Sequence, residues 1–327
     1  MPEIAKMIVV TGAAGFIGSA LIAHLLEEGY TDIVAVDDFS RADKNANLLN
    51  KKLRERVHRD DFFSWIDQNE QFIQLIFHLG ARTDTTEFDR SIFDRLNLNY
   101  SKEVWNKCID YALPLVYASS AATYGLGEFG YEDKDDLALK LKPLNPYGVS
   151  KNDFDKWILN QPRKPFFYAG IKFFNVYGPN EYHKGRMASV VYHTHRQIGE
   201  TGKMKLFQSH NRDFANGEQK RDFVYIKDVV KVLQFMMEER KVCGLFNLGT
   251  GEARTFNDLA TSTFRAMNIE PKIEYIPTPE DIRDKYQYFT QAEMQKLRSA
   301  GYSQPFTGLE EGIEEYVKEY LQTARYY

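Results

Sequence analysis

A glycine-rich turn near residue 12 constrains the fold more than any other feature of the sequence. Gly12, Gly15 and Gly18 recur every third residue between an apolar strand expected over residues 7–10 and a helix expected over 16–28. Glycine permits backbone conformations and close contacts that a Cβ forbids. We expect Gly12 to make the turn, Gly15 to admit a pyrophosphate and Gly18 to let helix and strand pack closely, at a helix N-terminus that attracts anions. This context predicts a dinucleotide-binding unit.

Short apolar segments alternate with helical segments through the first half of the chain. This alternation is typical of βαβ units and a parallel sheet. Beyond Tyr177 this alternation ends, and polar loops, scattered helices and prolines follow. We therefore predict an α/β protein, with a Rossmann-type doubly wound parallel sheet and a smaller mixed α/β substrate-binding lobe. Further strands are expected over 32–36, 75–78, 115–118 and 166–174, and helices over about 91–111, 147–159, 226–238 and 256–267.

The same pattern predicts how the two parts divide the chain. The dinucleotide-binding domain is expected to cover residues 1–176 and to take back a segment at about 221–250. The substrate-binding lobe is expected to consist mainly of residues 177–220 and 251–327.

Composition excludes several classes of function. The net charge is −4, and no long run of like charges occurs, whereas a nucleic-acid surface requires a basic stripe. The two cysteines, Cys108 and Cys243, lack the spacing of a metal site or a disulfide framework, so no metal is predicted. No stretch approaches the roughly twenty apolar residues of a membrane span, and the first residues lack the apolar core of a signal peptide. We expect a cytoplasmic protein without a membrane partner.

Charged residues after the second expected strand bear on the choice of cofactor. Asp37 ends that strand, and Asp38 follows, where a carboxylate accepts a hydrogen bond from the ribose 2′-hydroxyl of NAD. Arg41 and Lys44 come next and could pair with the 2′-phosphate of NADP. The residues alone leave NAD and NADP open.

Three further residues suit the oxidation of an alcohol. Ser120 follows the strand expected over 115–118, and Tyr147 and Lys151 lie four apart, on one face of a helix. A phenol with a pKa of about 10 is a poor base at neutral pH, but a cation one turn away, together with the positively charged nicotinamide, lowers that pKa. Ser120 can hydrogen-bond the same substrate hydroxyl while its carbon gives a hydride to a nicotinamide.

The Gly-x-x-Gly-x-x-Gly turn, the strand-end serine and the Tyr-x-x-x-Lys pair together resemble the extended short-chain dehydrogenase/reductase family. This resemblance implies that Ser120, Tyr147 and Lys151 are catalytic. His78, before the matching Leu79-Gly80-Ala81 segment, is expected to be an ordinary buried histidine. The cofactor-binding residues implied are Gly12, Gly15, Phe16, Ile17, Gly18, Asp37, Asp38, Lys44, Leu79, Gly80, Ala81, Asn97, Tyr147, Lys151 and Val176.

Two alanines narrow the reaction within that family. Related nucleotide-sugar dehydratases carry an Asp-Glu pair directly after the strand-end Ser or Thr, because elimination of water needs an acid and a base. Ala121 and Ala122 occupy these positions here. Elimination is therefore disfavoured, and a reductase or an epimerase remains.

The segment His183-Lys184-Gly185-Arg186-Met187-Ala188-Ser189 resembles the ADP-heptose 6-epimerase subgroup of the family, as do Thr83 to Glu87 and Lys220 to Tyr225. The resemblance runs from about Met7 to beyond Gly312. It implies inversion at C6″ of ADP-D-glycero-β-D-manno-heptose by transient oxidation, at C6″ or C7″, with a tightly bound nicotinamide cofactor. NADP, one per subunit, is the cofactor expected, with NAD as the alternative. Lys184 is then a second acid/base beside Tyr147, with a pKa that burial and neighbouring cations are expected to lower.

The substrate shell follows from the same resemblance. Two departures from the subgroup stand out, because the polar loop over 208–219 is longer and Arg186 replaces a small residue. A homo-oligomer is also implied. The substrate-binding residues implied are Ser120, Asn175, Lys184, Arg186, His193, Phe207, Gln208, Ser209, His210, Arg221 and Tyr286.

Two other functions compete with this interpretation. A different nucleotide-sugar epimerase, such as a UDP-hexose 4-epimerase, would share the Ser120, Tyr147 and Lys151 trio without needing Lys184. A cofactor-binding protein without turnover would keep the fold, but it would not need the three intact catalytic side chains.

Overall fold

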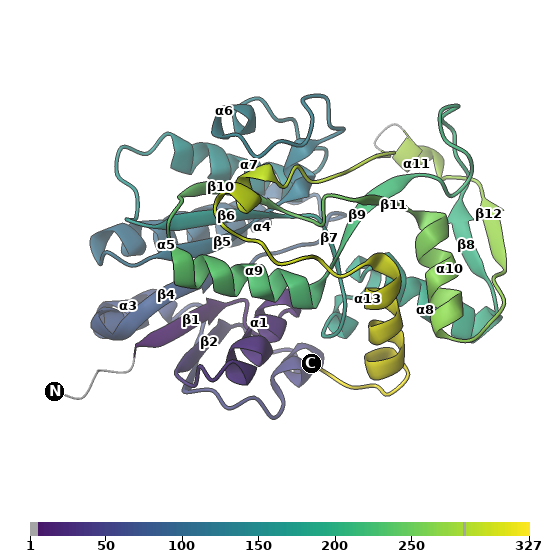
Figure 1. Cartoon of the computed structure of the whole chain (residues 1–327). Helices are drawn as coiled ribbons and strands as arrows, with labels where there is room; N and C mark the ends of the chain where they lie inside the picture. The colour runs from purple at the N-terminus through teal and green to yellow at the C-terminus, as the bar shows by residue number, and fades with distance from the viewer. Residues whose placement is uncertain (1–5, 284–285) are drawn as a thin grey trace.

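The main sheet consists of seven parallel strands, in the order β10-β6-β5-β4-β1-β2-β3 (Figure 1). The computed structural model describes residues 6–283 and 286–327. The strand order reverses between β1 and β4, where doubly wound sheets bind their ligands, so the predicted fold class is confirmed. The strands are β1 (Met7–Thr11), β2 (Ile33–Asp37), β3 (Glu55–His58), β4 (Ile73–His78), β5 (Leu115–Ser120), β6 (Tyr168–Phe173) and β10 (Gly244–Leu248).

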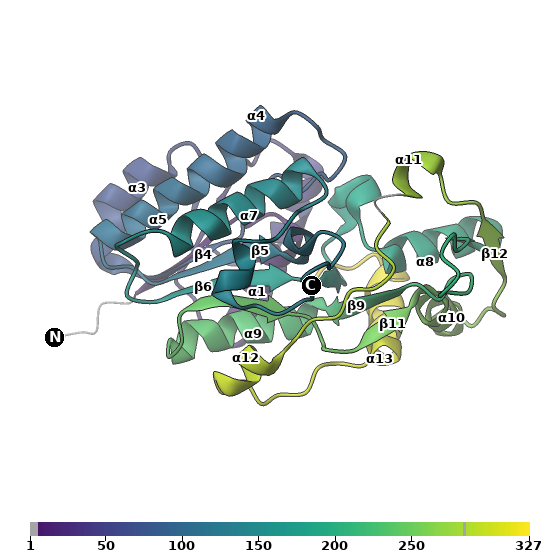
Figure 2. The same ribbon diagram turned by 90° about the horizontal axis from the view of Figure 1, so that it is seen from above.

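Helices cover both faces of this sheet (Figure 2). Helices α1 (Phe16–Glu27) and α9 (Ile226–Glu239) pack on one face with Ile8 and Val10. Helices α3 (Phe62–Asn69), α5 (Tyr100–Asp110) and α7 (Pro146–Leu159) pack on the other with Met7 and Val9. Successive side chains of a strand point to opposite faces, so β1 contributes to two separate cores.

The helix expected over about 91–111 is interrupted. It consists of α4 (Arg90–Phe93), a π-helical turn (Asp94–Asn99) and α5. A π turn holds one residue more than an α turn and frequently marks a functional site. This one contains Asn97.

A smaller lobe lies beside the main sheet, at the right of Figure 1. A three-stranded sheet is ordered β11-β9-β7 and a two-stranded sheet pairs β12 with β8. The sequence analysis predicted none of these five strands, nor β3 and β10 of the main sheet. β3, β8 and β12 are four-residue strands with exposed positions, so their apolar signal is weak. The lobe contains β7 (Asn175–Tyr177), α8 (Val190–Thr201), β8 (Met204–Phe207), β9 (Lys220–Tyr225), β11 (Ala253–Thr255), α10 (Phe256–Ala266), β12 (Ile273–Ile276) and α13 (Leu309–Glu315).

The remaining elements are short. Within the described residues, no helix is both long and apolar enough to cross a lipid bilayer. The short α-helices are α2 (Ala42–Asn45), α6 (Asp135–Ala138), α11 (Glu280–Arg283) and α12 (Gln295–Ser299), the 3-10 helices are Ala46–Leu48, Glu70–Phe72, Ala121–Tyr124 and Tyr182–Met187, and a second π turn spans Tyr316–Leu321.

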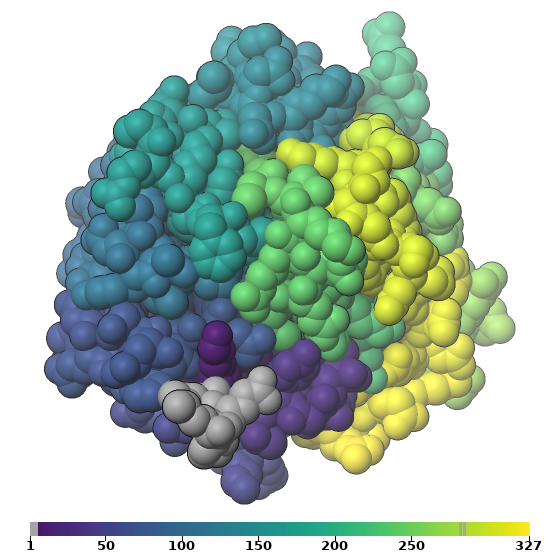
Figure 3. All heavy atoms as spheres, turned by 60° about the vertical axis from the view of Figure 1, so that its left-hand side comes forward, coloured from purple at the N-terminus to yellow at the C-terminus, as the bar shows by residue number. Residues whose placement is uncertain are grey.

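The segment after α12 returns along α9, as the yellow and green surfaces of Figure 3 show. The rings of Phe235 and Tyr302 lie 5.4 Å apart. The backbone N–H of Thr307 donates to Asp228 Oδ2 at 2.7 Å. These contacts fasten a segment late in the chain to the helical layer of the main sheet.

A buried ion pair joins α7 to β6. Lys172 Nζ lies 2.7 Å from Asp155 Oδ2, with side chains 1 % and 0 % exposed. Asp155 also accepts hydrogen bonds from the Tyr117 hydroxyl at 2.9 Å and the Ser119 hydroxyl at 2.7 Å. Lys172 donates to Thr123 Oγ1 at 2.8 Å. The network therefore holds together the segments on either side of Ser120.

We predict that Lys172→Met lowers the free energy of unfolding by about 3–5 kcal/mol, because it leaves the Asp155 carboxylate buried without a countercharge. Chemical denaturation measures this loss. The double variant Asp155→Leu/Lys172→Met should recover part of it. The matched control is Arg196→Met, which breaks the exposed Arg196–Glu200 pair and should change stability little. An equal loss in the free energy of unfolding for Lys172→Met and Arg196→Met would contradict this prediction.

Candidate active site

A cavity of about 860 Å³ opens at the carboxyl ends of β1, β2 and β4. It lies at the reversal of strand order, where a dinucleotide site is expected. The cavity brings together the glycine turn, the end of β2, the segment after β4 and the loop of Lys184. The sequence-predicted residues in its wall are Gly12, Gly15, Phe16, Ile17, Gly18, Asp37, Asp38, Lys44, Leu79, Gly80, Ala81, Lys184 and Arg186.

The glycine turn brings backbone segments closer together than residues with a Cβ would allow. Gly12 has a φ of +67°, and a Cβ there would lie 2.7 Å from the backbone nitrogen of Gly80. A Cβ on Gly18 would lie 2.3 Å from the Gly12 carbonyl oxygen. Gly15 caps α1 without a side-chain hydrogen bond, so the first N–H groups of the helix are available to an anion. These features fit a dinucleotide pyrophosphate.

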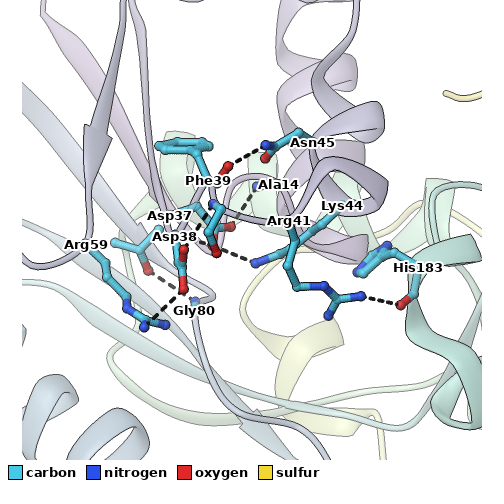
Figure 4. A network of polar contacts seen from close by, with 12 residues as sticks. Ala14, Asp37, Asp38, Phe39, Arg41, Lys44, Asn45, Arg59, Gly80 and His183 are labelled. Atoms are coloured by element: carbon cyan, nitrogen blue, oxygen red, sulfur yellow. Dashed lines mark hydrogen bonds and ion pairs between the residues drawn. The ribbon is translucent and has the colours of Figure 1, made fainter.

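Asp37 is held from three directions at the end of β2 (Figure 4). Its carboxylate accepts hydrogen bonds from the backbone N–H of Ala14 at 2.9 Å and of Asp38 at 2.7 Å, and from Lys44 Nζ at 2.5 Å. Asp37 is 6 % exposed. Lys44 therefore compensates the charge of the acid that the sequence assigned to a ribose hydroxyl.

Two arginines add to the positive charge at this rim, and both are drawn in Figure 4. Arg59 pairs with Asp38 at 3.2 Å. Arg41 donates to the carbonyl oxygen of His183 at 3.1 Å. The sequence interpretation missed Arg59 because it missed β3, whose pairing of His58 with Asp37 brings the two strand ends together. Only Val57 of that strand is buried, so the apolar signal was weak.

The strand-end serine meets the tyrosine of α7. Ser120 Oγ accepts a hydrogen bond from the N–H of Ala122 at 3.1 Å, and the Ser120 side chain lies close enough to the Tyr147 hydroxyl to affect its pKa. Burial raises the pKa of the Tyr147 hydroxyl, the nearby Ser120 side chain lowers it and the Asp155 charge raises it. The net upward direction is opposite to the lowering expected from Lys151, because desolvation outweighs the favourable contacts.

Lys151 lies deeper in the protein than the sequence indicated. Its side chain is 5 % exposed, and Nζ donates to the Ala118 carbonyl oxygen at 2.8 Å. Burial lowers the pKa of Lys151 to about 8, against the opposing charge of Asp155. Tyr147, Lys151 and Asp155 are spaced by four residues, so they share one face of α7.

Asn97 connects the cavity wall to α7. Its side chain accepts from the N–H of Arg82 at 2.8 Å and donates to the Arg82 carbonyl at 3.0 Å and to Ser150 Oγ at 3.0 Å. Ser150 Oγ donates to the Tyr147 carbonyl at 2.7 Å. The π turn therefore places one amide between the segment after β4 and the helix of the trio.

His78 is a fully bonded buried histidine, as expected. Its Nδ1 lies 2.7 Å from Thr11 Oγ1 and its Nε2 2.9 Å from Ser101 Oγ. Burial lowers the pKa of His78 to about 3, so the ring is neutral. Thr11 Oγ1 also accepts from the N–H of Gly80 at 3.1 Å, which fixes the position of Gly80 against the glycine turn.

Lys184 lies on the 3-10 segment Tyr182–Met187, over the start of α1. Its Nζ is 5.1 Å from the centre of the Phe16 ring. Burial lowers the pKa of Lys184, and the charge of Glu181 raises it. We had expected neighbouring cations to add to the lowering, but the charge that acts on Lys184 is this carboxylate. Burial also lowers the pKa of His183 to about 4, with smaller contributions from nearby cations.

Arg186, the departure from the subgroup pattern, reaches across the cavity. Its guanidinium lies 3.3 Å from Asp84 Oδ1, on the segment after β4. The His193 ring, on α8, lies 3.3 Å from the Arg186 carbonyl oxygen. The Lys184 loop therefore contacts the opposite wall.

Four of the predicted substrate residues gather in the small lobe, away from the cavity wall. Arg221 lies 5.7 Å from the Tyr286 ring. The rings of Phe207 and His210 lie 6.3 and 6.1 Å from that of Tyr286. The Arg221 guanidinium donates a hydrogen bond to the Gln287 carbonyl oxygen. Burial of this side chain lowers the pKa of Arg221. These side chains form an aromatic surface around one cation.

Other predicted residues are more dispersed. Asn175 is exposed in β7, and the adjacent Val176 is half-buried. Gln208 is exposed, with its side chain donating to the Tyr275 carbonyl at 3.3 Å. Ser209 Oγ donates to the Asn211 carbonyl at 2.7 Å.

Comparison with known proteins agrees with this arrangement. The model of the NAD dependent epimerase/dehydratase family matches residues 8–249. An ADP-L-glycero-D-manno-heptose-6-epimerase of Nitratidesulfovibrio vulgaris is 48 % identical over 320 residues, which are 97 % of this chain and 99 % of that protein.

Solved structures show the same fold. The ADP-L-glycero-D-manno-heptose-6-epimerase of Helicobacter pylori is 26 % identical, with a TM-score of 0.79 over 98 % of each chain. MoeE5, solved in complex with UDP-glucose and NAD, is 25 % identical, with a TM-score of 0.77 over 98 % of this chain and 100 % of that one. From the extent of the family match and the identity to a near full-length relative, the chain belongs to the NAD dependent epimerase/dehydratase family.

Proposed function

We propose that this protein inverts C6″ of ADP-D-glycero-β-D-manno-heptose to give ADP-L-glycero-β-D-manno-heptose, a precursor of the lipopolysaccharide core. The observation that carries the proposal is that Lys184 lines the same cavity as the glycine turn. A second acid/base facing the cofactor site is what inversion by oxidation and reduction requires. Near full-length similarity to heptose epimerases supports the identity of the sugar.

The proposed chemistry begins at the trio. A carbinol C–H is too weak an acid to lose its proton directly, so oxidation comes first. Reversible hydride transfer is the chemistry that a bound nicotinamide cofactor supplies. Tyr147 takes the proton of the sugar hydroxyl, Ser120 hydrogen-bonds that oxygen, and Lys151 stabilises the phenolate. After the carbonyl intermediate has rotated in the site, the hydride returns to its other face and Lys184 donates a proton to the carbonyl oxygen, which restores the alcohol with inverted configuration.

We infer that the cofactor is NADP, one per subunit and tightly bound. Lys44 already offsets the charge of Asp37, and Arg59 that of Asp38. Arg41 lies at the same rim. Because each of these carboxylates is already paired with a cation, neither would repel a 2′-phosphate as strongly as an unpaired acid, and the phosphate would meet the cations of the two pairs. An unpaired acid would instead favour the 2′-hydroxyl of NAD. The turn residues through Gly18, the segment 79–81, Asn97 and Val176 complete the proposed cofactor site.

The substrate shell is part of the same proposal. Arg221 carries a planar donor set that suits a pyrophosphate, and the surrounding rings offer stacking surfaces. The proposed division keeps 1–176 with about 221–250 as the dinucleotide-binding domain and mainly 177–220 with 251–327 as the substrate-binding lobe, although β9, which carries Arg221, pairs with β7 and β11 in the lobe. A homo-oligomer in the cytoplasm is the proposed working form. The proposed substrate-binding residues are Ser120, Asn175, Lys184, Arg186, His193, Phe207, Gln208, Ser209, His210, Arg221 and Tyr286.

The first test is an NMR time course with ADP-D-glycero-β-D-manno-heptose, with UDP-galactose in parallel and no added cofactor. We expect the heptose alone to be converted, because the purified protein retains its cofactor. Conversion of UDP-galactose alone would replace the proposal with a hexose 4-epimerase. No conversion of either sugar, even after adding NADP and NAD, would exclude the proposed reaction.

Lys184→Ala should lower kcat for the heptose by about 10²- to 10⁴-fold, the usual contribution of a positioned acid/base. The cofactor should remain bound, which its absorbance reports. Lys205→Ala, at an exposed lysine in the small lobe, is the matched control and should turn over normally. Undiminished epimerisation by Lys184→Ala would refute the two-base proposal.

Lys44→Ala should shift the cofactor content from NADP towards NAD by about 10- to 100-fold, because it removes a charge-assisted contact and leaves Asp37 uncompensated. Chromatography of the nucleotides released on denaturation measures the ratio. Lys52→Ala, at an exposed lysine nearby, should leave the ratio unchanged. Release of NAD from the unmodified protein would show that Asp37 holds a ribose hydroxyl despite Lys44.

A further inference from the structure

A buried carboxylate stands three residues before Lys184. Glu181 is 0 % exposed. Its Oε1 accepts hydrogen bonds from Ser189 Oγ at 2.7 Å, from the Tyr316 hydroxyl at 3.1 Å and from the N–H of Gly178 at 3.4 Å. Its Oε2 accepts from the N–H of Ser189. One side chain thus ties together both ends of the Lys184 loop and a residue late in the chain.

These partners identify Glu181 as an ionised group. Backbone N–H groups can only donate. Ser189 Oγ accepts from the N–H of Tyr192 at 3.2 Å, so its own proton is free for Glu181. Burial and the charge of Glu181 raise the pKa of Tyr316 well above 10, so this phenol keeps its proton and donates it. A carboxylate that receives donors on both oxygens is stabilised in its charged form.

Lys184 follows Glu181 by one 3-10 turn, since Glu181 caps the segment Tyr182–Met187 and the backbone N–H of Lys184 donates to the Glu181 carbonyl oxygen at 2.9 Å. Side chains three residues apart in a 3-10 turn lie on the same side, so the two charges act on each other. Burial raises the pKa of Glu181, and the Lys184 charge opposes that rise. Burial lowers the pKa of Lys184, and the Glu181 charge opposes that fall. Each charge therefore helps to keep the other group ionised, in addition to the hydrogen bonds that Glu181 accepts, since an isolated buried charge is expensive.

The other charges near the Lys184 loop already have partners. Lys44 is paired with Asp37, and Arg41 with Asp43 at 2.5 Å. Arg186 is paired with Asp84.

His183 carries no charge at neutral pH, because burial lowers its pKa to about 4. The Phe16 ring below Lys184 bears no charge. Among the groups near Lys184 in the described part of the chain, Glu181 is therefore the one whose charge favours the protonated amine against the effect of burial.

We propose that Glu181 is a positioning residue that holds the Lys184 loop and keeps Lys184 protonated in the resting site, so that Lys184 starts the reaction as a proton donor. The consequence for catalysis depends on the proposed function, in which Lys184 is an acid/base. The charge relation between the two side chains does not depend on it.

The test measures the protonation of Lys184 directly. Only a neutral amine reacts with acetic anhydride, so trace labelling at a series of pH values, read by peptide mass spectrometry, gives a half-labelling pH for Lys184. In Glu181→Gln this value should fall by about one pH unit or more, because an attractive charge is lost. The labelling of the exposed Lys205, followed in the same digests, should not move.

Matched variants separate charge from structure. Tyr316→Phe and Ser189→Ala each remove a donor to Glu181 but keep its carboxylate, so they should lower the melting temperature with a much smaller shift at Lys184. Glu181→Asp restores the charge and should return the half-labelling pH towards that of the unmodified protein. Equal shifts in all of these variants would reduce Glu181 to a structural role and overturn the proposal.

If the Glu181→Gln variant does not fold, a measurement on another variant tests the same proposal. Lys184→Met leaves Glu181 uncompensated and should lower the melting temperature at pH 8 more than at pH 5, where Glu181 can take up a proton. A loss that does not depend on pH would contradict the proposed pair.

Activity then distinguishes the two proposals. In Glu181→Gln, the alkaline limb of the kcat/KM profile for the heptose should move to lower pH together with the labelling curve. If labelling shifts while Lys184→Ala epimerises normally, the pair stands and the proposed role of Lys184 in catalysis fails. If Lys184→Ala is inactive and labelling does not shift, the Glu181 proposal alone fails.

Discussion

The contact between Gly12 and Gly80 is the constraint on which the cofactor side of the molecule depends. A Cβ on Gly12 would meet the Gly80 backbone at 2.7 Å, so β1 and β4 can end this close together only with glycine at position 12, and a Cβ on Gly80 would lie 3.1 Å from the Gly12 nitrogen. The N–H of Gly80 is fixed on Thr11 Oγ1, and Thr11 in turn on the neutral ring of His78. The crevice at the strand reversal, and every side chain that lines it, takes its position from this junction.

A second constraint governs the catalytic side. The Asp155–Lys172 pair lies under the end of β5 with no exposure to water, and its hydrogen bonds reach Tyr117, Ser119 and Thr123. Ser120 thus projects from a strand end whose neighbours on both sides are bonded to the same buried charges. Because Asp155 also shares a helix face with Tyr147 and Lys151, the network both supports the trio and contributes to its electrostatics.

The sequence predicted the features that depend on local pattern. The glycine turn, the alternating strands and helices, and the spacing of Tyr147 and Lys151 were all readable, because each is set by neighbours along the chain. Features made by distant segments were not readable. Arg59 pairs with Asp38 because it follows β3, a strand with only one buried residue. Asp155 on α7 pairs with Lys172 on β6, which is a separate element. The burial of Tyr147 and Lys151 was not predicted either, since burial depends on the whole fold.

The π turn over Asp94–Asn99 has a consequence for how this segment can change in length. One residue of an α-helix turns the chain by about 100°. Deleting a single residue from the turn would restore regular helical bonding locally, yet it would rotate Asn97 away from Arg82 and Ser150 or turn the apolar face of α5 away from the sheet. Because of the extra residue, the Asn97 amide keeps its hydrogen-bond partners while the apolar face of α5 stays packed against the sheet. Substitutions are therefore tolerable here in a way that insertions and deletions are not.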